Sequence, residues 1–201
     1  MAFLEKDLKP DPYGQFDAWF SEAEKKMGRE WATAFCLSTV DQQGSPEGRM
    51  VLLKEFDAQG FIFYTNLHSP KGRALAGHPK AAMTFHWQPL ERQVRIQGNT
   101  ELLSDAEADA YFQSRPRLSQ LGAWASRQSE PLKSRFALLR EVVRYALKYP
   151  TGIIPRPPQW NGFRIKPLRL EFWQAGTHRL HDRFLYEKQS GGSWSATRLY
   201  P

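Results

Sequence analysis

The stretch ATAFCLSTVDQQGSPEGRMVLLKEFDAQGFIFYTN, residues 32–66, most constrains how this chain can fold. It contains three runs rich in β-branched and aromatic residues, separated by the segments DQQGSPEG and DAQG. Side chains of those types favour strands, and clusters of Gly, Asp and Pro favour turns. Strands joined by such short connections pair in an antiparallel manner. We therefore expect an antiparallel sheet at the centre of the fold.

Helices are predicted to pack outside this sheet. Apolar residues recur at helical spacing in QFDAWFSEAEKKMG, and Ser104 with Glu107 forms the capping-box pattern that begins another helix. Pro116 must end or kink that helix. Helices are expected over residues 15–28, 69–79, 104–115, 118–128 and 132–149, and further strands over 80–103, 164–174, 179–189 and 194–201. The pattern predicts one mainly β, α+β domain over residues 1–201, an antiparallel β-barrel of six to eight strands, with a flexible lead over residues 1–14.

The charge balance indicates an anionic partner. The 201 residues include 28 basic and 21 acidic side chains, a net charge of +7, which suits a nucleic acid, a membrane surface or a phosphorylated small molecule. The basic residues are scattered rather than gathered in a run, which favours discrete phosphate contacts. The single cysteine, Cys36, excludes an intramolecular disulfide and is expected to be a buried thiol. No apolar run approaches the roughly 18–20 residues of a membrane span, so we expect a cytoplasmic protein with no membrane partner. Because the basic residues form no continuous run, a nucleic-acid partner is not the expected one.

Two stretches of the predicted sheet carry candidate anion-binding residues. Arg49 and Lys54 flank the apolar part of GRMVLLKEF, and a regular strand would place them on opposite faces unless a bulge or a strand end intervenes. In FYTNLHSPK, Tyr64 and Thr65 offer hydroxyls, and Lys71 lies in the first turn of a predicted helix. A cation there is unfavourable for the helix dipole unless an anion also binds. Solvated strand ends and a plain capped helix are the alternative interpretations.

Polar residues farther along the chain extend this set. Gln93 lies within a predicted strand, where its amide either reads the polar edge of a flat ring or faces solvent. Tyr111 and Arg115 are four residues apart on one helix face, and Ser119 follows after the proline break. Together they offer an aromatic surface, a bidentate anion binder and a hydroxyl, or else they form an exposed amphipathic helix end.

Near the C-terminus, the segment RLHDRF places Arg179, His181 and Arg183 at alternate positions. In an extended strand these three side chains would share one face at roughly 6–7 Å intervals, and their repulsion calls for an anion nearby. His178 and His181 do not predict a metal site, because no cysteine or carboxylate cluster supplies further ligands. The chain also lacks a G-x-S-x-G nucleophile motif and the glycine fingerprints of Rossmann and P-loop proteins.

Six stretches, taken together and in order, resemble one family. The segments RMVLLK, FYTN..S.K, ERQV, YF.SRP..SQ.GAW.S.QS, PRPP.W.GF and EFWQ...HRLHDRF are similar to the pyridoxine/pyridoxamine 5′-phosphate oxidase family, from about residue 9 to the end of the chain. The resemblance implies an FMN-binding split β-barrel with peripheral helices, working as a homodimer with FMN at the subunit interface. It also implies oxidation of pyridoxamine or pyridoxine 5′-phosphate to pyridoxal 5′-phosphate, with dioxygen as acceptor and release of hydrogen peroxide.

The resemblance assigns roles residue by residue. The residues implied in FMN binding are Arg49, Met50, Val51, Leu52, Leu53, Lys54, Tyr64, Thr65, Lys71, Gln93, Gln128, Ser129, Trp173 and Arg183. Those implied in substrate binding are Lys54, Tyr111, Arg115, Ser119, Arg179 and His181, of which Arg179 and His181 are the expected catalytic residues. Whether His181 transfers a proton or only positions the substrate is open at this point.

Two departures from the family pattern support other hypotheses. The family usually carries Arg-Lys after the serine of FYTN..S, whereas this chain has Pro70 before Lys71, with Arg73 as a candidate substitute. The basic N-terminal segment of some members is nearly missing, which bears on a secondary product site. The alternatives to the oxidase are a split-barrel protein that holds FMN or pyridoxal phosphate with little turnover and, from the charge alone, a nucleic-acid binder.

Overall fold

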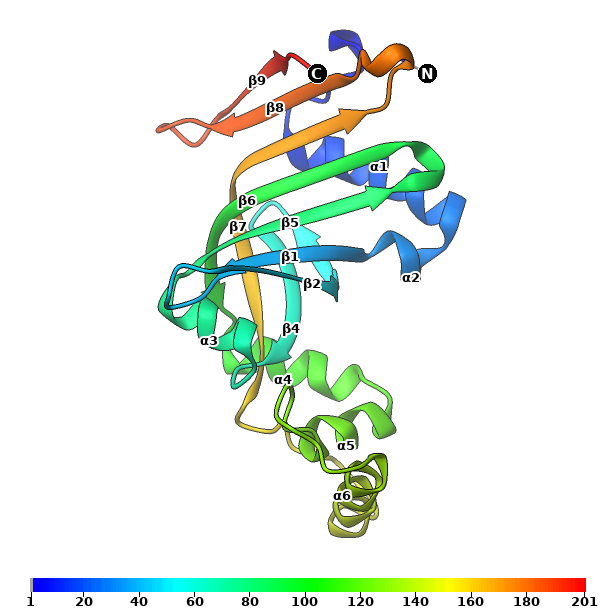
Figure 1. The fold of residues 1–201 in the computed structure, drawn as a ribbon, viewed down its shortest axis with the longest axis vertical. Coiled ribbons are helices and arrows are strands. Elements are labelled where there is room, and N and C mark those ends of the chain that lie inside the picture. The colour runs from blue at the N-terminus through cyan, green and yellow to red at the C-terminus, as the bar shows by residue number, and fades with distance from the viewer. Residues whose placement is uncertain (1) are drawn as a thin grey trace.

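The computed structural model describes residues 2–201, and its central element is a nine-stranded antiparallel sheet (Figure 1). The strands are β1 (Ala34–Val40), β2 (Pro46–Leu52), β3 (Glu55–Asp57), β4 (Gly60–Asn66), β5 (Lys80–Trp87), β6 (Arg92–Leu102), β7 (Trp160–Gln174), β8 (Asp182–Lys188) and β9 (Trp194–Leu199). They follow the order β2-β1-β5-β6-β7-β4-β3, and β8 and β9 extend the sheet from β7.

All five expected helices are present, with ends shifted by up to three residues, and the short helix α2 was not expected. The helices are α1 (Pro12–Met27), α2 (Arg29–Ala32), α3 (Pro70–Gly77), α4 (Asp105–Ser114), α5 (Arg117–Ala125) and α6 (Arg135–Lys148), with 3-10 turns at Glu5–Asp7, Gln88–Leu90 and Thr177–Arg179. Ser104 and Glu107 form the expected capping box of α4, and Pro116 separates α4 from α5. None of the helices in residues 2–201 has both the length and the apolar character of a membrane span.

The strand β7 holds the two halves of the sheet together. It pairs with β6 along most of its length, with β4 over residues 160–165 and with β8 over residues 169–174. The register with β6 shifts at Gly98, opposite Pro167, and a Cβ on Gly98 would lie 2.1 Å from a β7 carbonyl oxygen. Proline has no N–H to donate to a ladder, so β7 changes its neighbour where the ladder is interrupted.

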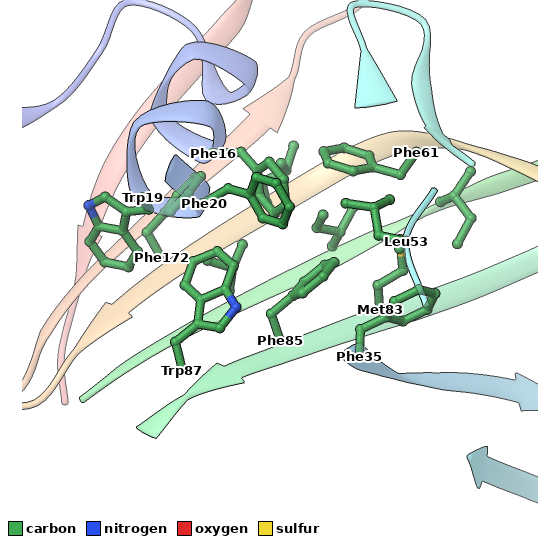
Figure 2. Packing of buried hydrophobic residues seen from close by; sticks show 14 of the residues in the cluster. Phe16, Trp19, Phe20, Phe35, Leu53, Phe61, Met83, Phe85, Trp87 and Phe172 are labelled. Atoms are coloured by element: carbon green, nitrogen blue, oxygen red, sulfur yellow. The ribbon is translucent and has the colours of Figure 1, made fainter. Parts of the chain in front are cut away.

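The main core lies between α1 and the sheet, and Figure 2 shows its aromatic side chains. Phe16 of α1 is fully buried. Its ring centroid lies 4.9–5.9 Å from those of Phe56, Phe61, Phe85 and Trp87. Three of these four pairs are edge-to-face, the arrangement that the aromatic quadrupole favours. The helical spacing of aromatic residues in α1 therefore fixes this helix to the sheet.

A smaller core lies at the other end of the molecule, where α4, α5 and α6 gather beyond β4 (Figure 1). Phe112 of α4, Leu121 of α5, Ile154 and Trp160 are buried together there. One side of α6 packs against this cluster. These contacts place α4 and α5 beside the end of β4.

The strand count corrects the sequence-based expectation. The described residues form nine strands instead of six to eight. One additional strand arises because GRMVLLKEF is split into β2 and β3 at Leu53 and Lys54. This is the strand end that the spacing of Arg49 and Lys54 required if both were to serve one ligand.

The C-terminal hairpin corrects a second expectation. The strand predicted over residues 179–189 begins only at Asp182, because Arg179 ends a 3-10 turn with a φ of 65°. Left-handed backbone interrupts an extended strand. Arg179, His181 and Arg183 therefore do not line one face of one strand.

Cys36 and the N-terminal lead also differ from the simplest expectation. Cys36 is half-buried, not fully buried, because it lies on the less buried face of β1. In the lead, the Phe3 side chain is buried and its N–H donates to Asp182 at 2.9 Å. The helix α1 already begins at Pro12. The flexibility of residues 1–14 stays a prediction.

Replacing Phe16 with alanine is expected to lower the free energy of unfolding by about 3–5 kcal/mol, because the lost ring leaves a cavity among rigid neighbours. Leu147→Ala is the matched control: this side chain is 77% exposed, and its loss should change the free energy by less than about 0.5 kcal/mol. Urea unfolding at one protein concentration measures both. Equal losses for the two variants would contradict this account of the core.

Candidate active site

A cavity of about 590 Å³ opens where the end of β4 meets α4 and α5. The predicted site residues that line it are Lys54, Tyr64, Thr65, Tyr111, Arg115, Ser119 and Gln128. The helix break at Pro116 allows α4 and α5 to approach the cavity from two directions. Residues that the sequence predicted from separate motifs thus meet at one place.

Three nearly parallel rings form one wall of this cavity. The Tyr64 ring lies 4.0 Å from the Tyr111 ring and 5.0 Å from the Trp160 ring, with interplanar angles of 7° and 5°. Gly162 makes room for the stack, since a Cβ there would lie 2.8 Å from the Tyr64 ring. Burial raises the pKa of both tyrosine hydroxyls. Both hydroxyls therefore stay protonated and can donate hydrogen bonds.

Arg115 and Lys54 bring two positive charges into the cavity. The Arg115 guanidinium lies 4.8 Å from the Trp160 ring centroid, and its Nη1 is buried without a hydrogen-bond partner among residues 2–201. Burial lowers the pKa of Arg115. Burial, followed by the charges of Arg115 and Arg29, lowers the pKa of Lys54. Buried charge of one sign is unfavourable without compensation, so this arrangement suits an anionic ligand.

A second cationic group lies at the N-terminus of α3. Lys71 Nζ donates to Gln128 Oε1 at 2.8 Å and to Ser69 Oγ at 3.2 Å. The Thr65 hydroxyl donates to the same Gln128 oxygen at 3.4 Å. Burial, and then the charge of Arg49, lowers the pKa of Lys71. Lys71 and Arg49 therefore form a second pair of neighbouring cations.

The strand β2 carries Arg49 at the edge of the sheet. Arg49 pairs with Glu47 at 2.5 Å and donates to Thr39 Oγ1 at 2.7 Å. The four predicted residues that follow differ in exposure: Met50 and Leu52 are exposed, Val51 is half-buried and Leu53 is buried. Because β1 is the one strand that pairs with β2 in residues 2–201, one edge of β2 leaves its backbone groups free for a ligand.

Pro70 has a local structural role. It occupies the first turn of α3, where proline is favoured because its missing N–H would have no helical partner. Ser69 caps the helix by accepting from the Gly72 N–H at 3.3 Å. Arg73 donates through Nη1 to the His68 carbonyl, so it is engaged with the preceding turn.

The strands β6, β7 and β8 carry a second group of predicted residues. Gln93, Trp173 and Arg183 are register partners across these strands, and they share one face. Arg183 donates through Nε and Nη2 to Glu171 Oε1 at 3.1 and 3.0 Å, and Arg95 reaches the other Glu171 oxygen at 3.3 Å. The anion beside Arg183 is thus a carboxylate of the protein itself.

His181 lies beside this group, in the turn before β8. Its ring centroid is 4.7 Å from that of Trp173, and its Nδ1 accepts from the Gly176 N–H at 3.2 Å. In the neutral ring the proton is then on Nε2. The turn needs glycine, because a Cβ on Gly176 would lie 1.8 Å from the Leu180 carbonyl oxygen. Arg179 is exposed at the end of the same turn.

The predicted residues therefore form two separate groups. We call Lys54, Tyr64, Thr65, Lys71, Tyr111, Arg115, Ser119 and Gln128 the cavity group, and Gln93, Trp173, His181 and Arg183 the β6–β8 row. Trp160 begins β7 beside the cavity, and Trp173 lies near its other end. A strand of 15 residues spans roughly 45–50 Å, and Figure 1 shows the two ends of β7 far apart. Ser129, with a φ of 71°, follows Gln128 in the loop after α5.

Trp160 and Asn66 line the cavity without having been predicted from the sequence. Trp160 lies in the motif PRPP.W.GF, which carried the family resemblance but gave no role to this side chain. Its stacking depends on α4, β4 and β7 meeting, which no local pattern reveals. Within residues 2–201, no cluster of three or more His, Cys, Asp or Glu side chains could hold a metal ion.

Comparison with known proteins decides the family. Residues 22–149 match the family model described as pyridoxamine 5′-phosphate oxidase, and residues 160–201 match that of the pyridoxine 5′-phosphate oxidase C-terminal dimerisation region. This chain belongs to the pyridoxine/pyridoxamine 5′-phosphate oxidase family. A relative of that name from Chelativorans sp. (strain BNC1) is 53% identical, over 100% of this chain and 99% of its own length. Another from Caulobacter vibrioides (strain NA1000 / CB15N) is 52% identical over 95% of this chain and 85% of its own length.

Two solved structures agree with this chain in fold. PhzG from Burkholderia lata 383, crystallised with tetrahydrophenazine-1-carboxylic acid, is 32% identical with a TM-score of 0.91, covering 100% of this chain and 98% of its own. A pyridoxamine 5′-phosphate oxidase-related, FMN binding protein from Nostoc punctiforme PCC 73102 has a TM-score of 0.77 at 18% identity, covering 96% of this chain and 100% of its own. The predicted split-barrel class, mainly β with peripheral helices, is confirmed.

The lowered pKa of Lys54 predicts a pH dependence of anion binding. Lys54 is cationic below its pKa, so affinity for inorganic phosphate should fall as the pH rises through that value, and at a lower pH than an ordinary lysine would give. Lys54→Arg keeps its charge over this range and should flatten the alkaline decline. Calorimetric titration of phosphate across the alkaline range measures both profiles. Equally steep declines in the two proteins would rule out Lys54 as the titrating group.

Proposed function

We propose that this chain is an FMN-dependent oxidase that converts pyridoxamine 5′-phosphate and pyridoxine 5′-phosphate to pyridoxal 5′-phosphate, in the synthesis and salvage of vitamin B6. The observation that carries the proposal is a cavity lined by two cations, Lys54 and Arg115. A second pair of cations, Lys71 and Arg49, lies next to it, since Lys71 donates to Gln128 of the cavity lining. FMN and the substrate are both phosphate esters. Two separate phosphate groups call for two separate sets of charge-assisted donors.

The residues present fit FMN. Lys71, Thr65 and Gln128 offer a connected set of polar side chains beside Arg49, and the open edge of β2 offers backbone groups. Bound FMN supplies the two-electron acceptor for substrate oxidation, and dioxygen regenerates it with release of hydrogen peroxide. The protein's role is to hold both ligands in the correct relative orientation, since hydride transfer depends on alignment.

The other pair of cations suits the substrate. Lys54, Tyr111, Arg115 and Ser119 would hold its phosphate, with the unpartnered Nη1 of Arg115 as a ready donor. Arg179 and His181 would position the ring. Because Nδ1 of His181 accepts from Gly176, the neutral imidazole presents Nε2–H as a donor. That arrangement favours a positioning role over proton abstraction.

We also propose that the active site is completed by a second copy of the chain. One ligand cannot touch both the cavity group and the β6–β8 row of one chain, because β7 separates them by most of its length. A two-fold dimer would bring the row of one copy to the cavity of the other. The match of residues 160–201 to a dimerisation region and the exposure of Met50 and Leu52 support this arrangement.

Two other functions stay as alternatives with their own tests. The first is a protein that binds FMN or pyridoxal phosphate with little turnover, motivated by Pro70 at the start of α3. The second is oxidation of a reduced phenazine precursor, motivated by the similarity to PhzG. Identity of 53% to a named B6-phosphate oxidase, against 32% to PhzG, favours the B6 substrates.

Oxygen uptake by the FMN-loaded protein is expected with pyridoxine 5′-phosphate and with pyridoxamine 5′-phosphate, together with equal amounts of pyridoxal 5′-phosphate and hydrogen peroxide. With the amine substrate, one water is consumed and one ammonia is released as well. An oxygen electrode and the absorbance of the aldehyde product measure both. Flavin binding without oxygen uptake would establish the binding-protein alternative. Uptake with tetrahydrophenazine-1-carboxylic acid, and with neither B6 phosphate, would establish the second.

Substitutions in the C-terminal turn and in β8 should separate two roles. Arg179→Ala is expected to lower kcat/KM by about 10- to 100-fold with flavin still bound, because substrate alignment is lost. Arg183→Ala should weaken FMN binding by about tenfold, the loss of one charge-assisted contact, while Arg95 still neutralises Glu171. Flavin fluorescence titration and steady-state kinetics measure the split. Equal loss of flavin in both variants would refute this division.

A further inference from the structure

Arg164 of β7 is a buried cation with three carboxylate partners outside the cavity. Its side chain is only 8% exposed, and it lies 3.1 Å from Asp57, 3.8 Å from Glu101 and 3.0 Å from Glu107. A buried guanidinium with several carboxylates can bind groups from several elements in a fixed geometry. Each of these three carboxylates belongs to a different element of the fold.

Two of those elements carry the residues expected to hold the substrate phosphate. Asp57 ends β3, and Lys54 immediately precedes that strand, with its N–H bonded to the Ile62 carbonyl across the β3–β4 hairpin. Glu107 is in the first turn of α4, and the same helix carries Tyr111 and leads into Arg115. Glu101 is in β6, which carries none of these residues. Arg164 is thus the common partner of the hairpin that holds Lys54 and the helix that holds Tyr111.

Arg156 is a second arginine that binds carboxylates of α4. It donates to Asp109 at 2.6 Å and to Asp105 at 2.5 Å, both on α4, and to the Trp160 carbonyl at 2.8 Å. Trp160 is the residue over which the Arg115 guanidinium lies. Two arginines from the β7 region therefore fix the helix against both the hairpin and the aromatic wall.

We propose that Arg164 is a positioning residue for the substrate phosphate, acting through Asp57 and Glu107 to set the distance between Lys54 and the α4 side chains. The inference rests on the proposed function, in which Lys54, Tyr111 and Arg115 bind that phosphate. Lys54 and Arg115 repel each other, so without a fixed frame the two cations would separate. Arg164 resists this separation because its own carboxylates tie both supporting elements to one strand.

The test compares three carboxylate variants of similar exposure around one arginine. Glu107→Gln keeps the capping box, which accepts either Glu or Gln, but loses the ion pair with Arg164. Asp57→Asn likewise keeps the turn hydrogen bonds from Gln59 and Gly60. Glu101→Gln is the matched control: its side chain is 43% exposed, against 46% for Glu107, and its strand carries none of the phosphate-binding residues.

Equilibrium binding of pyridoxal 5′-phosphate to the FMN-loaded protein is the main measurement. Glu107→Gln and Asp57→Asn should each raise the Kd by about 5- to 10-fold, the usual effect of a weakened charge-assisted contact, and raise KM more than they lower kcat. Glu101→Gln should change the Kd by less than about twofold. In an Arg115→Ala background, Glu107→Gln should have no further effect on the Kd, because the two residues then act through the same lost contact.

The outcomes separate positioning from mere stability. If the rise in Kd is proportional to the loss of unfolding free energy in all three variants, Glu101→Gln included, the role of Arg164 is only structural and the proposal fails. An unchanged Kd in folded Glu107→Gln overturns it as well. Failure of the wild-type protein to oxidise either B6 phosphate would refute the proposed function instead, because the binding measurement does not depend on turnover.

Discussion

The change of neighbour along β7, from β4 to β8, is the constraint on which the rest of the structure depends. Because β6 pairs with β7 along most of its length, only one edge of β7 remains, and two strands share it. The bulge at Gly98 opposite Pro167 marks the boundary. One half of β7 then supports β4 and the helices around the cavity, while the other half supports the C-terminal hairpin. The separation of the two groups of predicted residues follows from this single topological feature.

Within the described part of the chain, the buried and half-buried cations are of two kinds, those paired with carboxylates and those left without a carboxylate partner. Arg164 and Arg156 are each matched by carboxylates within the chain. Lys54 and Arg115 instead have lowered pKa values from burial, and Arg115 keeps a buried Nη1 without a hydrogen-bond partner in residues 2–201. The compensated arginines hold the frame, and the uncompensated pair is left for a ligand. The net charge of +7 therefore says less about the ligand site than the positions of the cations that no carboxylate neutralises.

Local patterns predicted most elements of the fold, because caps, turns and aromatic spacing act over a few residues. The capping box at Ser104, the break at Pro116 and the apolar face of α1 are examples. Strand register and the pairing of distant strands have no such local sequence signature. Neither the number of strands nor the change of pairing partner along β7 could therefore be predicted. The segment RLHDRF shows the limit most clearly. Its alternation is typical of a strand, yet its first residue, Arg179, has left-handed backbone and ends a 3-10 turn, and the strand begins only at Asp182.

Part of the cavity lining could be predicted from the sequence, but its geometry could not. Several of the residues named from the resemblance line the cavity, but residue positions in a sequence do not give the distances between side chains. The counterion of Arg183 is an example: the sequence suggested a bound anion. Instead the guanidinium donates to Glu171, which lies on the neighbouring strand two residues from the register partner Trp173. Trp160 is another, because its role arises only when three elements meet. Pairings between residues distant in sequence decide which charges are neutralised and which rings stack.

Pro70, a departure from the family pattern, is accommodated in the first turn of α3 and changes which groups there can bind an anion. Pro70 has no N–H, the Gly72 N–H is bonded to the Ser69 hydroxyl, and the Arg73 N–H is bonded to the Ser69 carbonyl. The first turn of α3 therefore offers an anion little of the backbone donation that helix N-termini usually provide. Lys71 must supply the attraction from its side chain, with Arg49 beside it. Attraction for an anion beside α3 is thus expected to depend on two side-chain cations more than on the helix dipole.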